Sequence, residues 1–180
     1  MELLAGIRQR RSIRQFEDRP VPRDVIEAIV GDAAYAPSWK NGQPVRYMYT
    51  SDRAIMDAIA ENMVCGFTYN HDNLKKAPCL MVLTYVTGKS GYEKDGTFTT
   101  SKGDSFEMFD AGCAAEAFCL AAHDRGVGTV ITGIFEEDKI IELLKLPENM
   151  KIGCLIYMGY PAECPEAPKR KSVDQLLTFI

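Results

Sequence analysis

The stretch Ala111-Gly112-Cys113-Ala114-Ala115 does most to constrain the fold of this chain. It lies in the middle of 105–125, for which we predict a helix that starts at a capping box of Asp104 and Glu107 and stops before Gly126. A helix that is small or apolar on every side needs neighbours on every side. These neighbours are either the core of its own subunit or a second chain, because small side chains allow helices to approach closely.

The other elements follow from the spacing of apolar residues and from turn residues. A continuous apolar run from Leu80 to Val86 follows Pro78 and is typical of a strand buried on both faces. We expect further helices at 2–9, 22–34, 52–64 and 137–146, further strands at 45–50, 127–132 and 152–158, and a loop at 36–44.

Two segments show no regular spacing of apolar residues. Residues 87–103 contain four glycines among polar neighbours and are expected to form either a functional lid or a disordered loop. After Tyr160, three prolines enforce an extended arm with an apolar end, 176–180, which is expected to pack on its own subunit or on a neighbouring one. Without repeats or linkers, residues 1–180 are expected to form a single domain, with 160–180 as its arm.

Composition narrows the classes of function and the compartment. The formal net charge of −4, from 21 basic and 25 acidic residues, argues against a nucleic-acid or anionic-membrane partner. No stretch approaches the roughly 20 apolar residues that cross a bilayer, and the first residues do not resemble a signal peptide. The six cysteines form no Cys-x-x-Cys pair, which favours reduced thiols over disulfides or a metal site. We therefore expect a cytoplasmic protein without a metal ion.

Several familiar catalytic motifs are missing. Gly126-Val-Gly128 begins like a dinucleotide-binding turn, but we expect a strand after it where that motif has a helix. The sequence contains neither a phosphate-binding P-loop nor a Gly-x-Ser-x-Gly elbow. With two histidines, His71 and His123, there is no histidine-rich metal centre, and His123 is expected to be solvated. We name no catalytic residue.

Positive charge is concentrated near both ends of the chain, at 8–14 and at 169–171. The first cluster places Arg10, Arg11, Ser12 and Arg14 within five residues. Guanidinium groups bind phosphate oxygens in a bidentate manner, so a phosphate-bearing ligand is one interpretation. The alternative is a solvated basic helix end that interacts favourably with the helix dipole.

Several separated motifs resemble, in order, those of the flavin-dependent nitroreductases. They are Arg-Arg-Ser-Ile-Arg-Gln-Phe at 10–16, Ala-Pro-Ser-Trp-Lys-Asn-Gly-Gln-Pro at 36–44, Asp110-x-Gly112, Gly126-x-Gly128-Thr129, the turn at 131–135, and Met158-Gly159-Tyr160-Pro161. The resemblance covers essentially the whole chain. It implies an α+β fold, with a central, mostly antiparallel sheet surrounded by helices, in a homodimer whose extended arms cross to the partner subunit.

The resemblance also implies FMN, bound without a covalent bond between the two subunits. The residues that would hold its phosphate and ribityl chain are Arg10, Arg11, Ser12 and Arg14. Two basic residues of the arm, Lys169 and Lys171, would reach the same phosphate.

Further residues are implied around the flavin ring. Asn70 would contact its pyrimidine end, and Thr132 and Gly133 would direct a backbone N–H toward flavin N5. The other subunit would line the ring and ribityl side with four residues of the 36–44 loop, namely Pro37, Ser38, Trp39 and Asn41.

By the same resemblance, a hydride passes from NAD(P)H through flavin N5 to a nitroaromatic, a quinone or a similar small acceptor, in a ping-pong cycle. Two alternatives stay open. One is a flavin-binding storage or sensing protein without efficient turnover, and the other is a module that binds a phosphorylated ligand without flavin.

Overall fold

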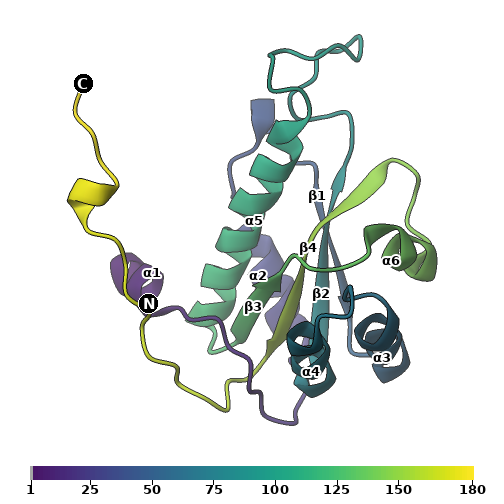
Figure 1. Cartoon of the computed structure of the whole chain (residues 1–180), viewed down its shortest axis with the longest axis vertical. Coiled ribbons are helices and arrows are strands. Elements are labelled where there is room, and N and C mark those ends of the chain that lie inside the picture. The colour runs from purple at the N-terminus through teal and green to yellow at the C-terminus, as the bar shows by residue number, and fades with distance from the viewer. Residues whose placement is uncertain (1) are drawn as a thin grey trace.

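The computed structural model describes residues 2–180 and is built around one four-stranded sheet (Figure 1). The strand order is β1-β2-β4-β3, and every neighbouring pair is antiparallel. The strands are β1 (Val45–Thr50), β2 (Cys79–Val86), β3 (Gly128–Thr132) and β4 (Met150–Gly159). The antiparallel sheet and all four strand positions confirm the sequence prediction.

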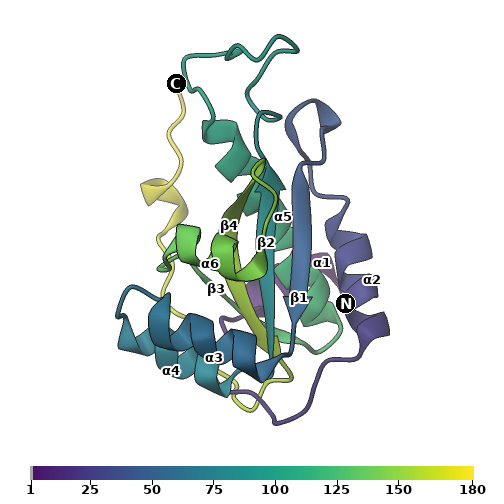
Figure 2. The same cartoon turned by 90° about the vertical axis from the view of Figure 1, so that its right-hand side faces the viewer.

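Helices cover both faces of this sheet (Figures 1 and 2). One face packs against α2 (Arg23–Ala33) and α5 (Ser105–Asp124). The opposite face packs against α3 (Arg53–Asn62), α4 (Thr68–Lys76) and α6 (Glu137–Leu144). The remaining helical elements are α1 (Leu3–Gln9) and two short 3-10 turns, Trp39–Asn41 and Val173–Gln175.

Strand β2 lies at the centre of both cores. Met81 and Leu83 pack under α2 and α5, whereas Leu80 and Val82 pack under the helices of the other face. All four side chains are at most 1% exposed. This alternation confirms that the apolar run forms a strand buried on both faces.

The sequence prediction misses one helix and is wrong about one helix start. Helix α4 was not predicted, because most of its residues are polar and the segment has no apolar stripe. The capping box at the start of α5 does not form, because Asp104 makes no side-chain capping hydrogen bond. Glu107 instead turns into the protein and accepts a 2.6 Å hydrogen bond from the backbone N–H of Gly88.

Helix α5 is buried on one side and open on the other. Ala111, Ala114 and Ala115 are buried against the sheet and α2. On the other side Met108 and Phe109 are 51% and 62% exposed. Its own subunit therefore does not provide the neighbours on every side that the sequence predicts.

The segment from Ser12 to Phe16 lies along the edge of the sheet. The backbone N–H of Ile13 donates to the carbonyl of Thr129 at 2.9 Å, and Phe16 forms a bridge with Pro161. Two glycines leave room for this crossing. A Cβ on Gly128 would lie 2.8 Å from Ile13 Cγ1, and one on Gly159 would lie 3.0 Å from Phe16 Cδ1.

Residues 87–103 form an ordered projection beyond the end of the sheet, with a bridge between Tyr92 and Phe98 (Figures 1 and 2). Beyond Pro165 the arm is exposed throughout. The six cysteines are free thiols, and Cys79, Cys119 and Cys154 are buried. Within residues 2–180, no helix has the length and apolar character needed to cross a membrane.

Candidate functional site

Three arginine side chains crowd the segment that follows α1. Arg11 Nη1 donates to the carbonyl of Arg8 at 2.6 Å, and Arg14 Nη1 donates to the carbonyl of Ser12 at 3.1 Å. The Nε atoms of Arg10, Arg11 and Arg14 are buried, and within residues 2–180 they have no hydrogen-bond partner. Buried donors without partners are unfavourable, and phosphate oxygens are the acceptors that guanidinium groups bind best. The cluster therefore has the donor set of an anion site.

Two glutamates adjoin this cluster, and sequence reasoning missed both. Glu116 Oε1 on α5 lies 3.6 Å from Arg10 Nε. Glu163 Oε1 accepts hydrogen bonds from the backbone N–H groups of Arg14 and Gln15 at 2.6 and 3.1 Å. The second contact ties the beginning of the arm to the arginine segment. A single glutamate among prolines gives no sequence signal for such a contact.

A cavity of about 210 Å³ lies between the arginine segment, the end of α5 and the arm. His123 forms part of its wall and is half-buried, so its side chain is only partly exposed to solvent. Burial lowers the pKa of His123, and the positive charge of Arg10 lowers it further. The pKa therefore reports the charge in this cavity.

Asn70, predicted for the flavin ring, follows a residue that lies close to Arg14. The Arg14 guanidinium carbon is 5.6 Å from the centre of the Tyr69 ring on α4. The next residue, Asn70, is buried, and its Nδ2 donates to the carbonyl of Ile134 at 3.2 Å. One chain thus joins the arginine segment, the first turn of α4 and the turn after β3.

In that turn, the Thr132 hydroxyl donates to the carbonyl of Leu155 at 3.2 Å. The side chain of Thr132 is therefore occupied, and backbone groups are what the turn can offer to a ligand. Gly133 is exposed, and a Cβ there would meet no atom within 4 Å. The open space allows a planar ring to approach the backbone closely.

The 36–44 loop lies far from the arginines of the same chain. The backbone N–H of Trp39 donates to Asp110 Oδ2 at 2.9 Å, near the beginning of α5. His123 in the arginine cavity lies near the end of that helix. Asp110 and His123 are thirteen residues apart on this helix, which corresponds to roughly 20 Å. A single chain therefore does not bring Pro37, Ser38, Trp39 and Asn41 to its own arginines.

The backbone of this loop is strained. Lys40, Asn41 and Gln43 have φ values of 48°, 54° and 45°, in a region that favours glycine and that asparagine tolerates better than lysine or glutamine. Lysine and glutamine in this region cost roughly 1–2 kcal/mol each and persist where contacts hold them. Ser38 Oγ accepts from the backbone N–H of Gln43 at 3.0 Å, and Asn41 Oδ1 accepts from Gln43 Nε2 at 3.3 Å.

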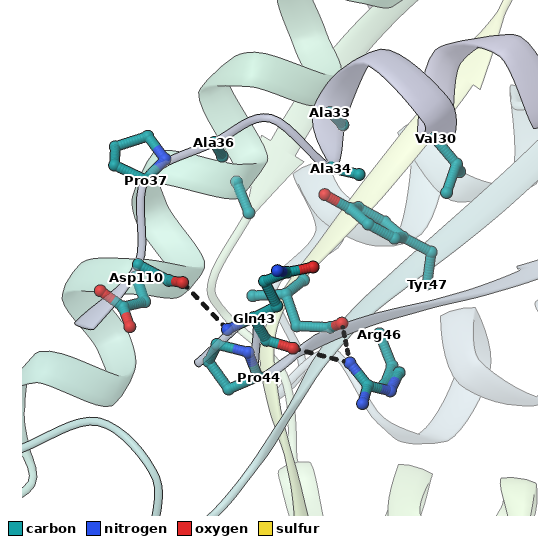
Figure 3. A pocket seen from close by; sticks show the side chains of 13 residues that line it. Val30, Ala33, Ala34, Ala36, Pro37, Gln43, Pro44, Arg46, Tyr47 and Asp110 are labelled. Carbon is teal, nitrogen blue, oxygen red and sulfur yellow. Dashed lines mark hydrogen bonds between the residues drawn. The ribbon is translucent and has the colours of Figure 1, made fainter. Parts of the chain in front are cut away.

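A second cavity, of about 320 Å³, lies under the loop between α2, β1 and α5 (Figure 3). Figure 3 shows Pro37 and Asp110 on one side of it and the Tyr47 ring on another. Burial raises the pKa of Tyr47 to about 12, so its hydroxyl stays neutral. This cavity is the larger of the two, but it has no arginine cluster. The charge needed to bind an anion lies in the smaller one.

Lys169 and Lys171 lie in the arm, and both are exposed. Their convergence on the phosphate site of Arg10 and Arg14 stays a prediction.

Comparison with known proteins identifies the family. The profile of the nitroreductase family matches residues 7–160. The chain belongs to the nitroreductase family. A relative in Methanothermobacter thermautotrophicus, provisionally named NADH dehydrogenase/NAD(P)H nitroreductase, is 31% identical over 169 residues, 92% of this chain and 80% of its own.

Two further nitroreductase relatives are informative. The crystal structure of a nitroreductase family protein from Clostridium novyi NT has a TM-score of 0.77 at 30% identity, over 93% of this chain and 89% of that one. The Bacillus subtilis protein named FMN reductase (NAD(P)H) is 27% identical over 171 residues, 90% of this chain and 67% of its own. The family is FMN-dependent. The arginine Nε atoms that make no hydrogen bond within residues 2–180 fit the phosphate of that cofactor.

The two histidines provide a test of this geometry. Hydrogen bonds to Asp72 and Glu61 raise the pKa of His71 above its ordinary value of 6.5, whereas burial lowers that of His123. Those His71 contacts stabilise the fold below the ordinary pKa, and their contribution is lost as the pH rises through the raised value. An NMR titration of the ring protons is expected to give two separate midpoints, one on each side of 6.5.

Addition of FMN is expected to raise the lower midpoint, because a phosphate anion favours the protonated form of His123. His71 is the internal control, since it lies on α4 with Asp72 and Glu61 as its charged neighbours. An unchanged His123 midpoint in FMN-saturated protein would exclude the arginine cavity as the phosphate site.

Proposed function

We propose that this chain is an FMN-dependent oxidoreductase that uses NAD(P)H to reduce a small acceptor such as a nitroaromatic compound or a quinone. The observation that carries the proposal is the arginine cluster, in which three buried Nε atoms make no hydrogen bond within residues 2–180, in a chain of the nitroreductase family. The free thiols are consistent with the reducing cytoplasm that we propose as its location.

Each part of the flavin has candidate residues in one chain. Arg10, Arg11, Ser12 and Arg14 hold the phosphate and ribityl chain, and Lys169 and Lys171 add positive charge from the arm. Asn70 orients the turn after β3 through the carbonyl of Ile134. Thr132 and Gly133 then present a backbone N–H to the ring edge, where a fixed donor stabilises developing negative charge.

When bound, FMN supplies the hydride transfer between NAD(P)H and the acceptor. The chain places the cofactor and provides its electrostatic surroundings. In this proposal FMN carries the redox chemistry and the chain binds and orients it, so no acid–base catalytic residue is required.

We propose a homodimer with the flavin sites at its interface. The roughly 20 Å of helix between Asp110 and His123 separate the two halves of the site within one chain, so a second subunit has to complete it. The proposed interface contains exposed apolar residues of α5, α1 and the arm, namely Met108, Phe109, Leu3, Leu4, Ile7, Leu176, Leu177 and Phe179.

Replacing both Met108 and Phe109 by glutamate is expected to convert the dimer into a monomer, because four charges then meet at the α5 contact. FMN affinity is expected to fall in parallel, since each site loses the partner's loop. Sedimentation velocity gives the association state, and a flavin titration gives the affinity. Glu142→Ala on α6, at an exposed position on the opposite face of the sheet, is the control. A double variant that stays dimeric contradicts the interface.

Reconstitution with FMN tests the proposed function. The purified protein is expected to bind the cofactor and turn yellow, and NADH or NADPH is expected to bleach it without oxygen. A colourless protein after reconstitution overturns both flavin-based interpretations and leaves the phosphorylated-ligand module. A yellow protein that neither nicotinamide bleaches overturns the enzyme and leaves the storage or sensing protein.

A further inference from the structure

We propose that Asp110 is a positioning residue that holds the strained loop carrying Trp39 and ties it to residues 87–103. Asp110 lies on the side of α5 that faces the protein and is 2% exposed. Its Oδ2 accepts hydrogen bonds from the backbone N–H of Trp39 at 2.9 Å and from Ser90 Oγ at 2.5 Å. One carboxylate oxygen thus joins three segments that are distant in the sequence.

The two hydrogen bonds from Trp39 and Ser90 are the polar contacts that stabilise the buried Asp110 carboxylate. Within residues 2–180 no cation lies within ion-pair distance of its carboxylate, and Ser90 is fully buried. A buried carboxylate without a cation is unfavourable unless hydrogen-bond donors satisfy it. An alanine would suit this part of α5 better as a helix former. The two donors from the loops are therefore what stabilises an aspartate here.

The contact also fixes an aromatic side chain. The Trp39 ring lies 4.5 Å from the Phe106 ring, one turn before Asp110 on the same helix. Lys40 Nζ reaches Glu93 in the projection at 3.1 Å. Figure 3 shows Pro37 and Asp110 on the same side of the cavity, so Asp110 lies close to the 36–44 loop.

The consequence at the flavin rests on the proposed function, but the anchoring itself does not. Without the Asp110 carboxylate, the φ values of Lys40, Asn41 and Gln43 lose a contact that maintains them. The loop then samples other conformations, and the partner's site loses part of its ordered wall. Asp110 would act on the flavin site through its contact with Trp39.

Two measurements on the flavin-free protein test the anchoring, using Trp39 as the single tryptophan of the chain. In Asp110→Ala we expect the Trp39 backbone N–H to exchange with solvent at least roughly tenfold faster, and acrylamide to quench Trp39 emission more strongly. Ser90→Ala is expected to show a smaller change in the same direction. Asp110→Asn is expected to lie between wild type and Asp110→Ala, because its amide oxygen can still accept from Trp39.

Glu107→Gln is the matched control. Glu107 is the other buried carboxylate at this end of α5; it accepts from Gly88 in the 87–103 segment and not from the 36–44 loop, and glutamine keeps an oxygen that accepts this hydrogen bond. Its variant is expected to leave Trp39 exchange and quenching unchanged. Should Asp110→Ala fail to fold, Asp110→Asn and Ser90→Ala decide the question. Wild-type exchange and quenching in all folded variants at 90 and 110 overturns the proposal.

A third measurement connects the anchor to function. FMN titration of Asp110→Ala is expected to give a dissociation constant at least roughly tenfold above wild type, with the Glu107→Gln value unchanged. Wild-type affinity in a variant with a mobile Trp39 overturns the role at the flavin and keeps the anchoring. If wild-type protein does not bind FMN, the proposed function fails, and the Trp39 measurements still decide the role of Asp110.

Discussion

Replacement of Arg10 and Arg14 by alanine is expected to weaken FMN binding at least roughly a hundredfold, since each hydrogen bond to a charged group contributes about 1.5–3 kcal/mol. Within residues 2–180 both guanidiniums have a buried Nε that makes no hydrogen bond, and a phosphate oxygen would accept one from each. A flavin-fluorescence titration measures the effect. In wild type, affinity is expected to fall with added salt, and this dependence is expected to weaken in the double variant.

Arg23→Ala is the control for the loss of an arginine outside the cluster. Arg23 lies on α2 with 91% of its side chain exposed, and it pairs with Glu27. Its removal is expected to leave FMN affinity unchanged. Wild-type affinity in the double variant would move the phosphate elsewhere. A separate Lys169→Ala and Lys171→Ala variant tests whether the arm reaches the same phosphate.

The sequence predicts the strands and most helices because their apolar residues repeat with the period of each element. The alternation of Leu80, Met81, Val82 and Leu83 between two cores is a direct example. Helix α4 was not predicted because its stability comes from tertiary packing of Leu74 and from ion pairs of Lys75 with Asp57 and Glu61. Neither depends on a local pattern.

In the candidate site, too, the sequence predicts the local features and misses the contacts between distant residues. Arginines close together in sequence stay together in space, so clustering alone indicates an anion site. Asp110 belongs to a recognisable motif, but its contacts with Trp39 and Ser90 join positions 71 and 20 residues apart. The contact of Glu107 is equally hard to predict. Glu107 accepts from Gly88 and does not cap the helix, and this contact depends on how residues 87–103 fold back. Such contacts arise only from the tertiary structure.

Gly159→Ala is expected to destabilise the fold by about 1–3 kcal/mol, which corresponds to a fall in Tm of roughly 3–10 °C. A Cβ at this position would lie 2.5 Å from Pro78 Cγ and 3.0 Å from Phe16 Cδ1. The Pro78 ring is closed onto its own backbone nitrogen, so it cannot move aside without shifting the chain. Thermal denaturation with and without FMN measures the effect.

Displacement of Phe16 in Gly159→Ala is expected to affect the candidate flavin site as well as the stability of the fold. Phe16 ends the segment that begins at Ser12 and carries Arg14, so its displacement is expected to weaken FMN binding together with the fold. Gly31→Ala is the matched control, because Gly31 lies on α2 and a Cβ there meets no atom within 4 Å. This change is expected to stabilise the helix by up to about 1 kcal/mol. Equal effects of the two substitutions would mean that the crossing of residues 12–16 does not require a glycine.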